Sequence, residues 1–254
     1  MPRFPTGESV LARGVRIVEA FDAGHATLSV SEIAERAGLH VATASRLAEE
    51  LVRDGWLARD SHRRLRLGMR LWEVVTRASP TLGLREAALP VMEDLRNVMG
   101  HHVQLAVLDG EEVLFLERLA APEAVVNYSR VAGRLPAHAS SSGLVLLAHA
   151  ASDARERALS SRLDRFTGAT ITEPAALRRA LADVRRQNYA LLRGHVHEDA
   201  AGIAVPLRDP VGTVVAALSL IVPNDDVALA RVPVLQAAAL TITRSMATTA
   251  PPAP

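Results

Sequence analysis

The apolar and polar positions between residues 29 and 67 predict two short helices followed by a small β-hairpin. Ser29 precedes Glu32 by three positions, and this spacing is typical of a capping box at the start of a helix. The apolar residues of the first helix recur on one face: Ile33, Ala34 and Ala37. Gly38 can adopt the positive φ that a sharp turn out of a helix requires, so the first helix is expected to end there.

A second helix is expected from about Val41 to Asp54. Its inward positions are small or aliphatic: Ala44, Leu47 and Leu51. Residues 56–59 and 64–67 then alternate with a period of two, which predicts the two strands of a hairpin. This order of elements is typical of a winged helix-turn-helix, in which the start of the second helix faces outward and enters the major groove of DNA.

The residues left facing outward have side chains suited to DNA. On the second helix they are His40, Ala42, Thr43, Ser45 and Arg46. Hydroxyl and guanidinium groups bind phosphate oxygens and base edges, so we predict that His40, Thr43, Ser45 and Arg46 contact DNA. The alternative interpretation is a solvated amphipathic helix pair with an ordinary charged hairpin.

The hairpin carries a local excess of positive charge. Within residues 59–70, five arginines stand against the single acid Asp60: Arg59, Arg63, Arg64, Arg66 and Arg70. We predict that the arginines at 59, 63, 64 and 66 follow the sugar-phosphate backbone as a wing, because phosphate contacts supply most of the sequence-independent affinity.

Beyond the hairpin, the pattern predicts a pair of helices and then a domain of mixed strands and helices. The first helix of the pair covers 68–78 and ends at Ser79-Pro80; the second runs from Leu84 to about Met99. Pro90 is expected to kink this second helix or to mark a new helix start. We place the domain boundary near Pro80, with a DNA-binding domain and the start of a linker helix in 1–79, and a second domain in 80–254.

The second domain is predicted to be α+β with an antiparallel sheet. Strands are expected at 103–108 and 113–118, joined by the Asp109-Gly110 turn. Helices follow at 135–150, 153–164 and 174–188, then strands at 189–192, 202–207 and 213–222, and a closing helix at about 227–247. The final segment, 249–254, is expected to be disordered.

Composition restricts the class of protein. The chain has 254 residues, of which 49% are hydrophobic, and it has no cysteine, so disulfides and thiolate metal sites are excluded. The net charge of +1 argues against a nucleic-acid coat protein and is compatible with a site-specific binder. No charged-then-apolar leader opens the sequence, and the longest apolar run, 211–223, is short for a membrane span. We therefore expect a cytoplasmic protein without a membrane partner.

Three segments in the same chain resemble the IclR family of bacterial transcriptional regulators. They are Leu39-His-Val-Ala-Thr-Ala-Ser-Arg-Leu47, Leu135-Pro-Ala-His-Ala-Ser-Ser-Ser-Gly143, and Gly202-Ile-Ala-Val-Pro-Leu-Arg-Asp209 with Gly212-Thr-Val-Val-Ala-Ala-Leu-Ser219. The resemblance implies a winged helix-turn-helix domain, a linker helix and a GAF-like effector-binding domain. It also implies a homodimer, often paired into a homotetramer, on palindromic double-stranded operator DNA. Small organic acids or aromatic compounds are the effectors that it implies, and catabolic operons the targets.

The resemblance also assigns residues to the effector site. Ser140, Ser141, Ser142 and Gly143 match the helix start that meets the effector, and Gly202 and Ser219 match positions of the pocket wall. His195, His197 or Glu198 takes the place of an acidic pocket residue in this alignment. The chain departs from the family at His40, where proline is frequent, at Ala42, where serine is frequent, and after Gly143, where a lysine is usual.

Elementary chemistry supports the same site independently. Three consecutive serines at a helix start combine hydroxyls with free amides at the positive end of the helix dipole, which suits a carboxylate. The alternative is simple N-capping with a small-residue helix interface. The wall is expected to be aliphatic, as in most ligand pockets. Its expected members are Leu135, Leu144, Val205 and Ile221.

Other functions receive less support from the sequence. His195 and His197 share one face if the segment is extended and could hold Zn²⁺, but no third ligand is evident. A hydrolytic triad of His138, the 140–142 serines and Asp199 lacks the strand-serine-helix elbow, and no nucleotide or metalloprotease motif occurs. A pure interaction module would not require the wing arginines. We therefore expect no catalytic residue, no metal and no cofactor, and a regulator whose DNA binding responds to a small effector.

Overall fold

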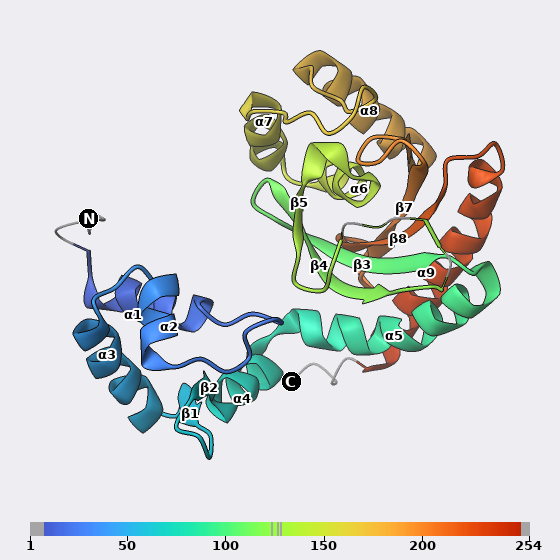
Figure 1. The fold of residues 1–254 in the computed structure, drawn as a ribbon. Coiled ribbons are helices and arrows are strands. Elements are labelled where there is room, and N and C mark those ends of the chain that lie inside the picture. The colour runs from blue at the N-terminus through green and yellow to red at the C-terminus, as the bar shows by residue number, and fades with distance from the viewer. Residues whose placement is uncertain (1–7, 123, 126, 128, 250–254) are drawn as a thin grey trace. The chain divides into compact units, whose positions relative to one another are not determined.

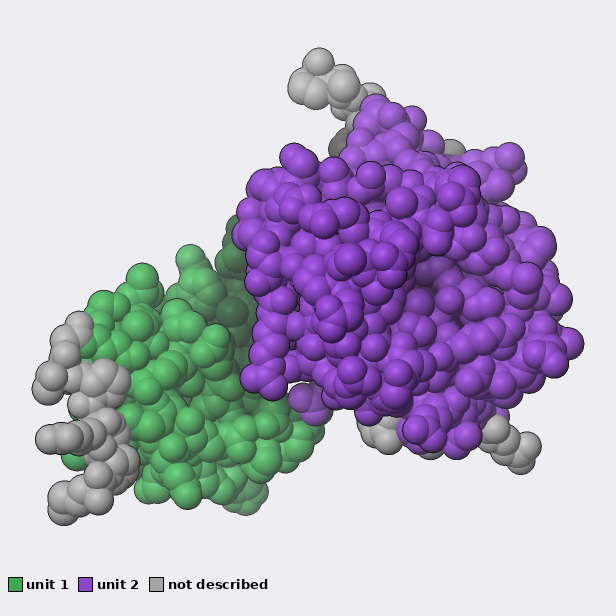
Figure 2. Space-filling model, turned by 90° about the horizontal axis from the view of Figure 1, so that it is seen from above, with its two compact units in different colours: residues 1–79 green, residues 80–254 purple. Residues whose placement is uncertain are grey.

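The computed structural model describes residues 8–249 apart from positions 123, 126 and 128 (Figure 1). The chain divides into two compact units, residues 1–79 and residues 80–254, which Figure 2 colours separately. Each unit is considered over its described residues. The terminal segment that is expected to be disordered lies outside them from position 250 onward.

The first unit is a winged helix-turn-helix. Its elements are α1 (Val10–Glu19), α2 (Val30–Arg36), α3 (Val41–Arg53), β1 (Leu57–Arg59), β2 (Leu65–Leu67) and α4 (Met69–Ala78). The capping box at Ser29 and Glu32 is confirmed, because the Ser29 hydroxyl accepts from the Glu32 amide at 3.2 Å and the Glu32 carboxylate accepts from the Ser29 amide at 2.6 Å. Gly38 has a φ of +59°, as a turn between α2 and α3 requires.

Helix α1 has no counterpart among the elements expected from the sequence. Ser9 caps it by accepting from the Ala12 amide, and Ile17 is its buried residue. Ile17 joins a core made by α1, α2, α3 and the hairpin, in which Ile33, Leu47 and Leu65 are also buried. The helix therefore completes a core that α2 and α3 cannot close alone.

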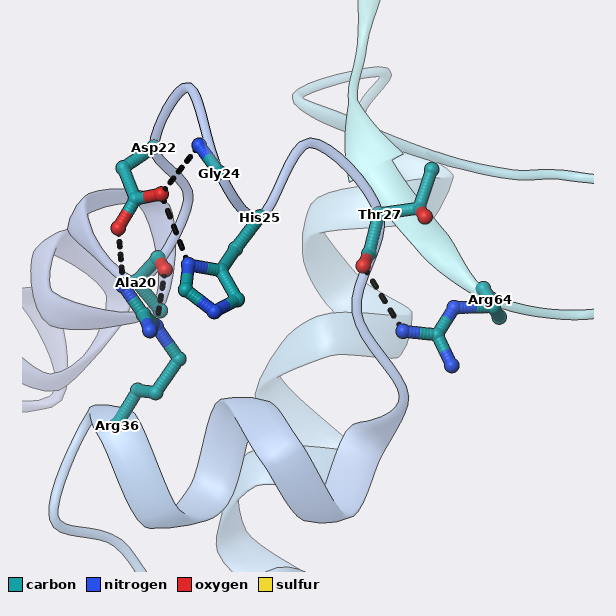
Figure 3. Close-up of polar contacts among 7 residues, drawn as sticks. All are labelled: Ala20, Asp22, Gly24, His25, Thr27, Arg36 and Arg64. Carbon is teal, nitrogen blue, oxygen red and sulfur yellow. Dashed lines mark hydrogen bonds and ion pairs between the residues drawn. The ribbon is translucent and has the colours of Figure 1, made fainter.

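Polar contacts fix the loops of this unit (Figure 3). The Asp22 carboxylate accepts from the Gly24 amide at 2.8 Å, from the His25 ring at 2.9 Å and from the Arg36 guanidinium at 2.5 Å. The hydrogen bond from His25 is the largest of the causes that lower the pKa of Asp22 to about 2. Arg36 also donates to the Ala20 carbonyl at 2.6 Å, so one side chain of α2 holds the end of α1 and the turn after it.

The second unit is an α+β domain, as expected. In the part of the chain that the structure describes, six antiparallel strands form one sheet in the order β5-β4-β3-β8-β7-β6. The strands are β3 (His102–Asp109), β4 (Glu112–Leu119), β5 (Arg134–Pro136), β6 (Ala190–Arg193), β7 (Ala200–Arg208) and β8 (Val214–Pro223). The helices are α5 (Pro80–Met99), α6 (Ser141–His149), α7 (Ser152–Ser160), α8 (Pro174–Gln187) and α9 (Val232–Thr249).

Helices cover both faces of this sheet (Figure 1). On one face, α5 and α9 pack against large aliphatic side chains such as Ile203, Leu218 and Leu220. On the other face, α6, α7 and α8 pack over small side chains: Ala106, Ala204 and Ala217. Small residues let α6 approach the sheet closely, and this approach positions the cavity described below.

Several element boundaries differ from the expected ones. Residues 134–136 form an edge strand rather than the start of a helix, because Leu135 pairs with Val113 of β4. A short 3₁₀ turn, Ala137–Ala139, follows, and α6 begins only at Ser141. A second 3₁₀ turn, Ala228–Arg231, likewise precedes α9.

Helix α5 also begins earlier than expected, at Pro80, and continues through Pro90. Proline is tolerated in the first turn of a helix because the amide it lacks would have no partner there. Helix α7 ends at Ser160, four residues before the expected end of that helix.

We expect Gly143→Ala to lower the free energy of unfolding by at least about 2 kcal/mol, since overpacking a rigid site is destabilising. A Cβ at position 143 would lie 2.1 Å from the Ala137 carbonyl oxygen, and backbone cannot move aside cheaply. Urea denaturation followed by circular dichroism measures the change. The matched control is Gly168→Ala, which meets no atom within 4 Å and should stay within about 0.5 kcal/mol of wild type. Equal stability of the two variants would show that α6 is free to shift.

Candidate functional site

The first candidate site is the outward side of α3. Ala44, Leu47 and Ala48 are buried on its inner side. On the outer side His40, Ala42 and Arg46 are exposed, and Thr43 and Ser45 are half-buried. The Arg46 guanidinium donates to the Glu50 carboxylate one turn later at 2.6 Å. The geometry therefore presents the predicted residues together, and their contact with DNA bases stays a prediction.

The wing arginines fall into two groups. Arg59 pairs with Glu49 and donates to the Arg63 carbonyl. Arg64 donates to Glu32 at 2.9 Å. It also donates to the Thr27 carbonyl at 3.0 Å, the contact drawn in Figure 3. Arg63 and Arg66 are exposed and form no ion pair with any described residue. The +4 excess of the sequence is thus partly neutralised within the fold, and Arg63, Arg66 and Arg70 are the exposed arginines of this stretch.

The second candidate site is a cavity in the second unit. Its wall combines the start of α6, residues from strands β3 to β8, and the segments before β5 and after β6. The residues that line it are Gln104, Phe115, Asn127, Ser129, Leu135, Ala139, Ser140, Ser141, Ser142, Leu192, His195, Val196, His197, Ala200, Gly202 and Ile221. The lining combines apolar side chains, among them the ring of Phe115, with the serines at the start of α6 and other polar side chains.

The three serines at this helix start have different roles. The Ser140 hydroxyl caps α6 by accepting from the Gly143 amide at 3.1 Å. The Ser142 hydroxyl is buried and donates to the Ser219 hydroxyl at 3.0 Å. Ser141 faces β7, since a Cβ added at Gly202 would lie 2.7 Å from its hydroxyl oxygen. The first amides of a helix have no partner within the helix, so this end can bind an anion.

The segment between β6 and β7 forms another side of the cavity. Thr167 donates to the Gly194 carbonyl and Thr170 to the His195 carbonyl, each at 2.6 Å. The His195 Nδ1 lies 3.1 Å from the Arg193 carbonyl, which can only accept, so Nδ1 carries the proton and Nε2 offers a lone pair. Burial lowers the pKa of His195, although the hydrogen bond to Arg193 raises it, and the ring is neutral near pH 7.

Some residues assigned to the site lie beside the cavity rather than in its wall. Gly143 packs against the Ala137 backbone, and Ser219 stands behind Ser142. Leu144 points into the core beneath α7 and α8, whereas Val205 points to the opposite face of the sheet. The expected aliphatic wall therefore retains Leu135 and Ile221 and loses the other two members.

Eight lining residues were not among the predicted ones: Gln104, Phe115, Asn127, Ser129, Ala139, Leu192, Val196 and Ala200. Gln104 carried a signal, because it is a polar residue inside the apolar strand Val103–Leu108 and is only 2% exposed. Phe115 is an aromatic residue in a buried strand position. Asn127 and Ser129 lie in a segment without periodic pattern, so no local signal identified them.

The residues considered for hydrolysis and for metal binding do not come together in the described part of the chain. His138 is buried, but its Nε2 lies 2.9 Å from the Asp164 carbonyl and it does not line the cavity. Over the described residues, no group of three or more His, Cys, Asp or Glu side chains could hold a metal ion. No helix in that same part of the chain has the length and apolar character needed to cross a membrane.

Comparison with known proteins identifies both units. A family model described as the IclR helix-turn-helix domain matches residues 10–61. A second model, described as the bacterial transcriptional regulator IclR C-terminal domain, matches residues 76–247. The second match alone covers more than half of the chain.

Known proteins also match this chain over most of its length. The HTH-type transcriptional regulator XynR of Escherichia coli K12 is 31% identical over 82% of this chain and 83% of its own length. The Pca regulon regulatory protein of Pseudomonas putida is 29% identical over 83% of this chain and 72% of its own. A crystal structure of an IclR homologue from Microbacterium hydrocarbonoxydans, complexed with 4-hydroxybenzoate, is 47% identical and covers 95% of this chain and 100% of that one, with a TM-score of 0.88. The chain belongs to the IclR family of bacterial transcriptional regulators.

Proposed function

We propose that this protein is a transcriptional regulator whose binding to operator DNA is switched by a small aromatic carboxylate. The observation that carries the proposal is the cavity whose wall includes the start of α6 together with apolar side chains. Free amides and the Ser141 hydroxyl suit the carboxylate, and Phe115, Leu135 and Ile221 suit the ring. The complex of the Microbacterium homologue with 4-hydroxybenzoate supports the same class of ligand.

The DNA-binding part of the proposal requires two copies of the chain. Two α3 helices must reach successive major grooves to read a palindromic operator. Helix α4 offers a surface for pairing, since it has no buried residue within the described part of its unit, and Met69 and Trp72 are 62% and 57% exposed. A contiguous apolar stripe of this kind marks an interaction site. We infer a homodimer that covers it, with a dimer of dimers as the next level.

The effector acts on DNA binding only through a difference in its affinity for two states of the protein. Strand β4 connects the cavity to α5: Phe115 lines the cavity, and the Glu117 carboxylate pairs with Arg85 of α5 at 2.5 Å. The Glu117 side chain is only 9% exposed, so this ion pair is well shielded from water on one side. A shift of β4 on ligand binding would therefore move α5, which follows α4 in the chain.

We expect Arg46→Ala and Arg66→Ala to weaken DNA binding in different ways. Arg46 is proposed to read base edges, so its loss should reduce affinity for the operator more than for random DNA. Arg66 is proposed to contact a phosphate, so its loss should weaken both equally and reduce the salt slope by about 1. Fluorescence anisotropy with an operator selected from a random-sequence pool measures both quantities at several salt concentrations.

Arg64→Ala is the comparison variant in the wing, because Arg64 donates to Glu32 and the Thr27 carbonyl within its own unit. It should lower the thermal midpoint of the protein, whereas Arg46→Ala and Arg66→Ala should leave it unchanged. An equal loss of operator and random binding in Arg46→Ala would refute the base-reading role of Arg46.

We expect Gly202→Ala to lower the affinity for 4-hydroxybenzoate at least tenfold, because the new methyl group would crowd Ser141 and fill part of the cavity. Operator affinity without ligand should be retained. Isothermal titration calorimetry measures the first quantity and anisotropy the second, with Gly168→Ala as the control outside the cavity. An unchanged ligand affinity in Gly202→Ala would place the effector elsewhere.

We expect Trp72→Glu to shift the protein from dimer to monomer, since a carboxylate in the apolar contact of α4 would be buried without a partner. Sedimentation velocity at micromolar concentration measures the oligomeric state. Val211→Glu is the control, because Val211 is 86% exposed and lies in a turn of the second unit. A dimer that persists in Trp72→Glu would exclude α4 as the main contact.

A further inference from the structure

A chain of buried hydrogen bonds runs from the start of α6 across the sheet. The Ser142 hydroxyl donates to the Ser219 hydroxyl, and Ser219 donates to the Gln104 side-chain carbonyl at 3.2 Å. Each hydroxyl has one proton, so the direction of the chain is fixed once the Gln104 carbonyl is an acceptor. The Ser142 proton is therefore committed to the protein, and Ser142 can only accept from a ligand.

The chain ends at Asn127. The Gln104 amide donates to the Asn127 carbonyl oxygen at 3.1 Å and also to the Ser129 hydroxyl. The amide and the hydroxyl of Ser129 both donate to the same Asn127 oxygen, at 3.0 and 2.9 Å. Among the described residues these donors converge on Oδ1, so rotating the Asn127 amide by 180° would break every one of these bonds. The identity of the Asn127 oxygen and nitrogen is therefore determined by its surroundings.

The other side of the same amide has no partner in the described part of the chain. The Asn127 Nδ2 is buried and makes no hydrogen bond with any described residue. Folded proteins rarely leave such a donor unsatisfied, and an exception indicates a missing group. Asn127 lines the effector cavity, so the group that this donor lacks is one that a ligand can supply.

We propose that Asn127 is a specificity-determining residue whose Nδ2 donates to a second oxygen of the effector, a ring hydroxyl rather than the carboxylate. The proposal rests on the aromatic carboxylate class inferred above. Asn127 is three hydrogen bonds away from Ser142 in this chain, so its Nδ2 is a donor distinct from those at the start of α6.

A hydroxyl group fits this position because it both accepts and donates. It accepts from the Asn127 amide, and its own proton requires an acceptor in the cavity. His195 lines the same cavity and offers the lone pair of Nε2, because its Nδ1 proton is held by the Arg193 carbonyl. A ligand without the hydroxyl would leave the Asn127 donor unpaired, and sites of this type discriminate strongly against such analogues.

The test compares the dissociation constants of 4-hydroxybenzoate and benzoate, measured by titration calorimetry on the full chain. For the wild-type protein we expect 4-hydroxybenzoate to bind at least tenfold more tightly. Asn127→Asp keeps an oxygen for the Gln104 and Ser129 donors and replaces the Nδ2 donor by an acceptor. We expect this variant to bind the two acids within about threefold of each other.

The ratio of the two dissociation constants separates recognition of the ring hydroxyl from repulsion of the carboxylate. The new negative charge weakens the binding of both acids by a similar factor, so it leaves the ratio unchanged. Asn97→Asp places the same charge on an exposed position of α5 and should leave the wild-type ratio unchanged. If Asn127→Asp does not fold, Asn127→Ala supplies the same ratio without the charge.

One outcome would overturn the role of Asn127. It is a wild-type ratio retained in the Asn127 variants, which means that benzoate and 4-hydroxybenzoate lose affinity by the same factor. Failure of the wild-type protein to bind either acid would instead refute the aromatic carboxylate class, and the proposed role of Asn127 would fall with it.

Discussion

The close approach of α6 to the sheet is the constraint on which the effector domain depends. Ala106, Ala204 and Ala217 make the face beneath α6 flat, and Gly202 leaves room for the Ser141 hydroxyl. Gly143 lets the first turn of α6 pass against the Ala137 carbonyl. Because all these residues are small, the positive end of the helix is embedded in the domain rather than exposed to water. The electrostatic attraction of that end for an anion is stronger in such an environment than on the surface.

The opposite face of the same strands carries mainly large side chains instead of small ones. Large aliphatic residues alternate with the small ones along β7 and β8, so one strand presents alanine to α6 and leucine or isoleucine to α5 and α9. In β4 the register shifts where Leu105 pairs with Glu117 and Ala106 pairs with Phe115. This bulge places Phe115 on the cavity side and Glu117 toward Arg85 of α5. Cavity and linker helix thus share a strand, and a ligand that displaces β4 acts on both faces at once.

The sequence predicted what local chemistry determines. The capping box at Ser29, the turn at Gly38 and the strands β7 and β8 are encoded by neighbouring residues, and the structure contains all of them. Strand β5 was not predicted, because it is three residues long and exists only by pairing with β4. The serines of the cavity were identified by their position at a helix start. Asn127 and Gln104 were not, since their importance arises from contacts more than twenty residues apart in the chain.

Partners distant in the sequence also change the net charge that the DNA-binding unit presents. A count of wing arginines treats each as a free cation, yet Arg59 and Arg64 are held by Glu49 and Glu32. Exposed ion pairs contribute only about 0–1 kcal/mol, so a phosphate can replace a carboxylate partner at little cost. Arg46 and Glu50 form such a pair on α3, with side chains 57% and 42% exposed. In the unbound protein the ion pair with Glu50 restricts the rotamers of Arg46. This pair breaks at little cost in free energy when the guanidinium binds another group. A guanidinium held in this way loses less conformational entropy on binding, which favours a base contact of fixed geometry over general attraction to DNA.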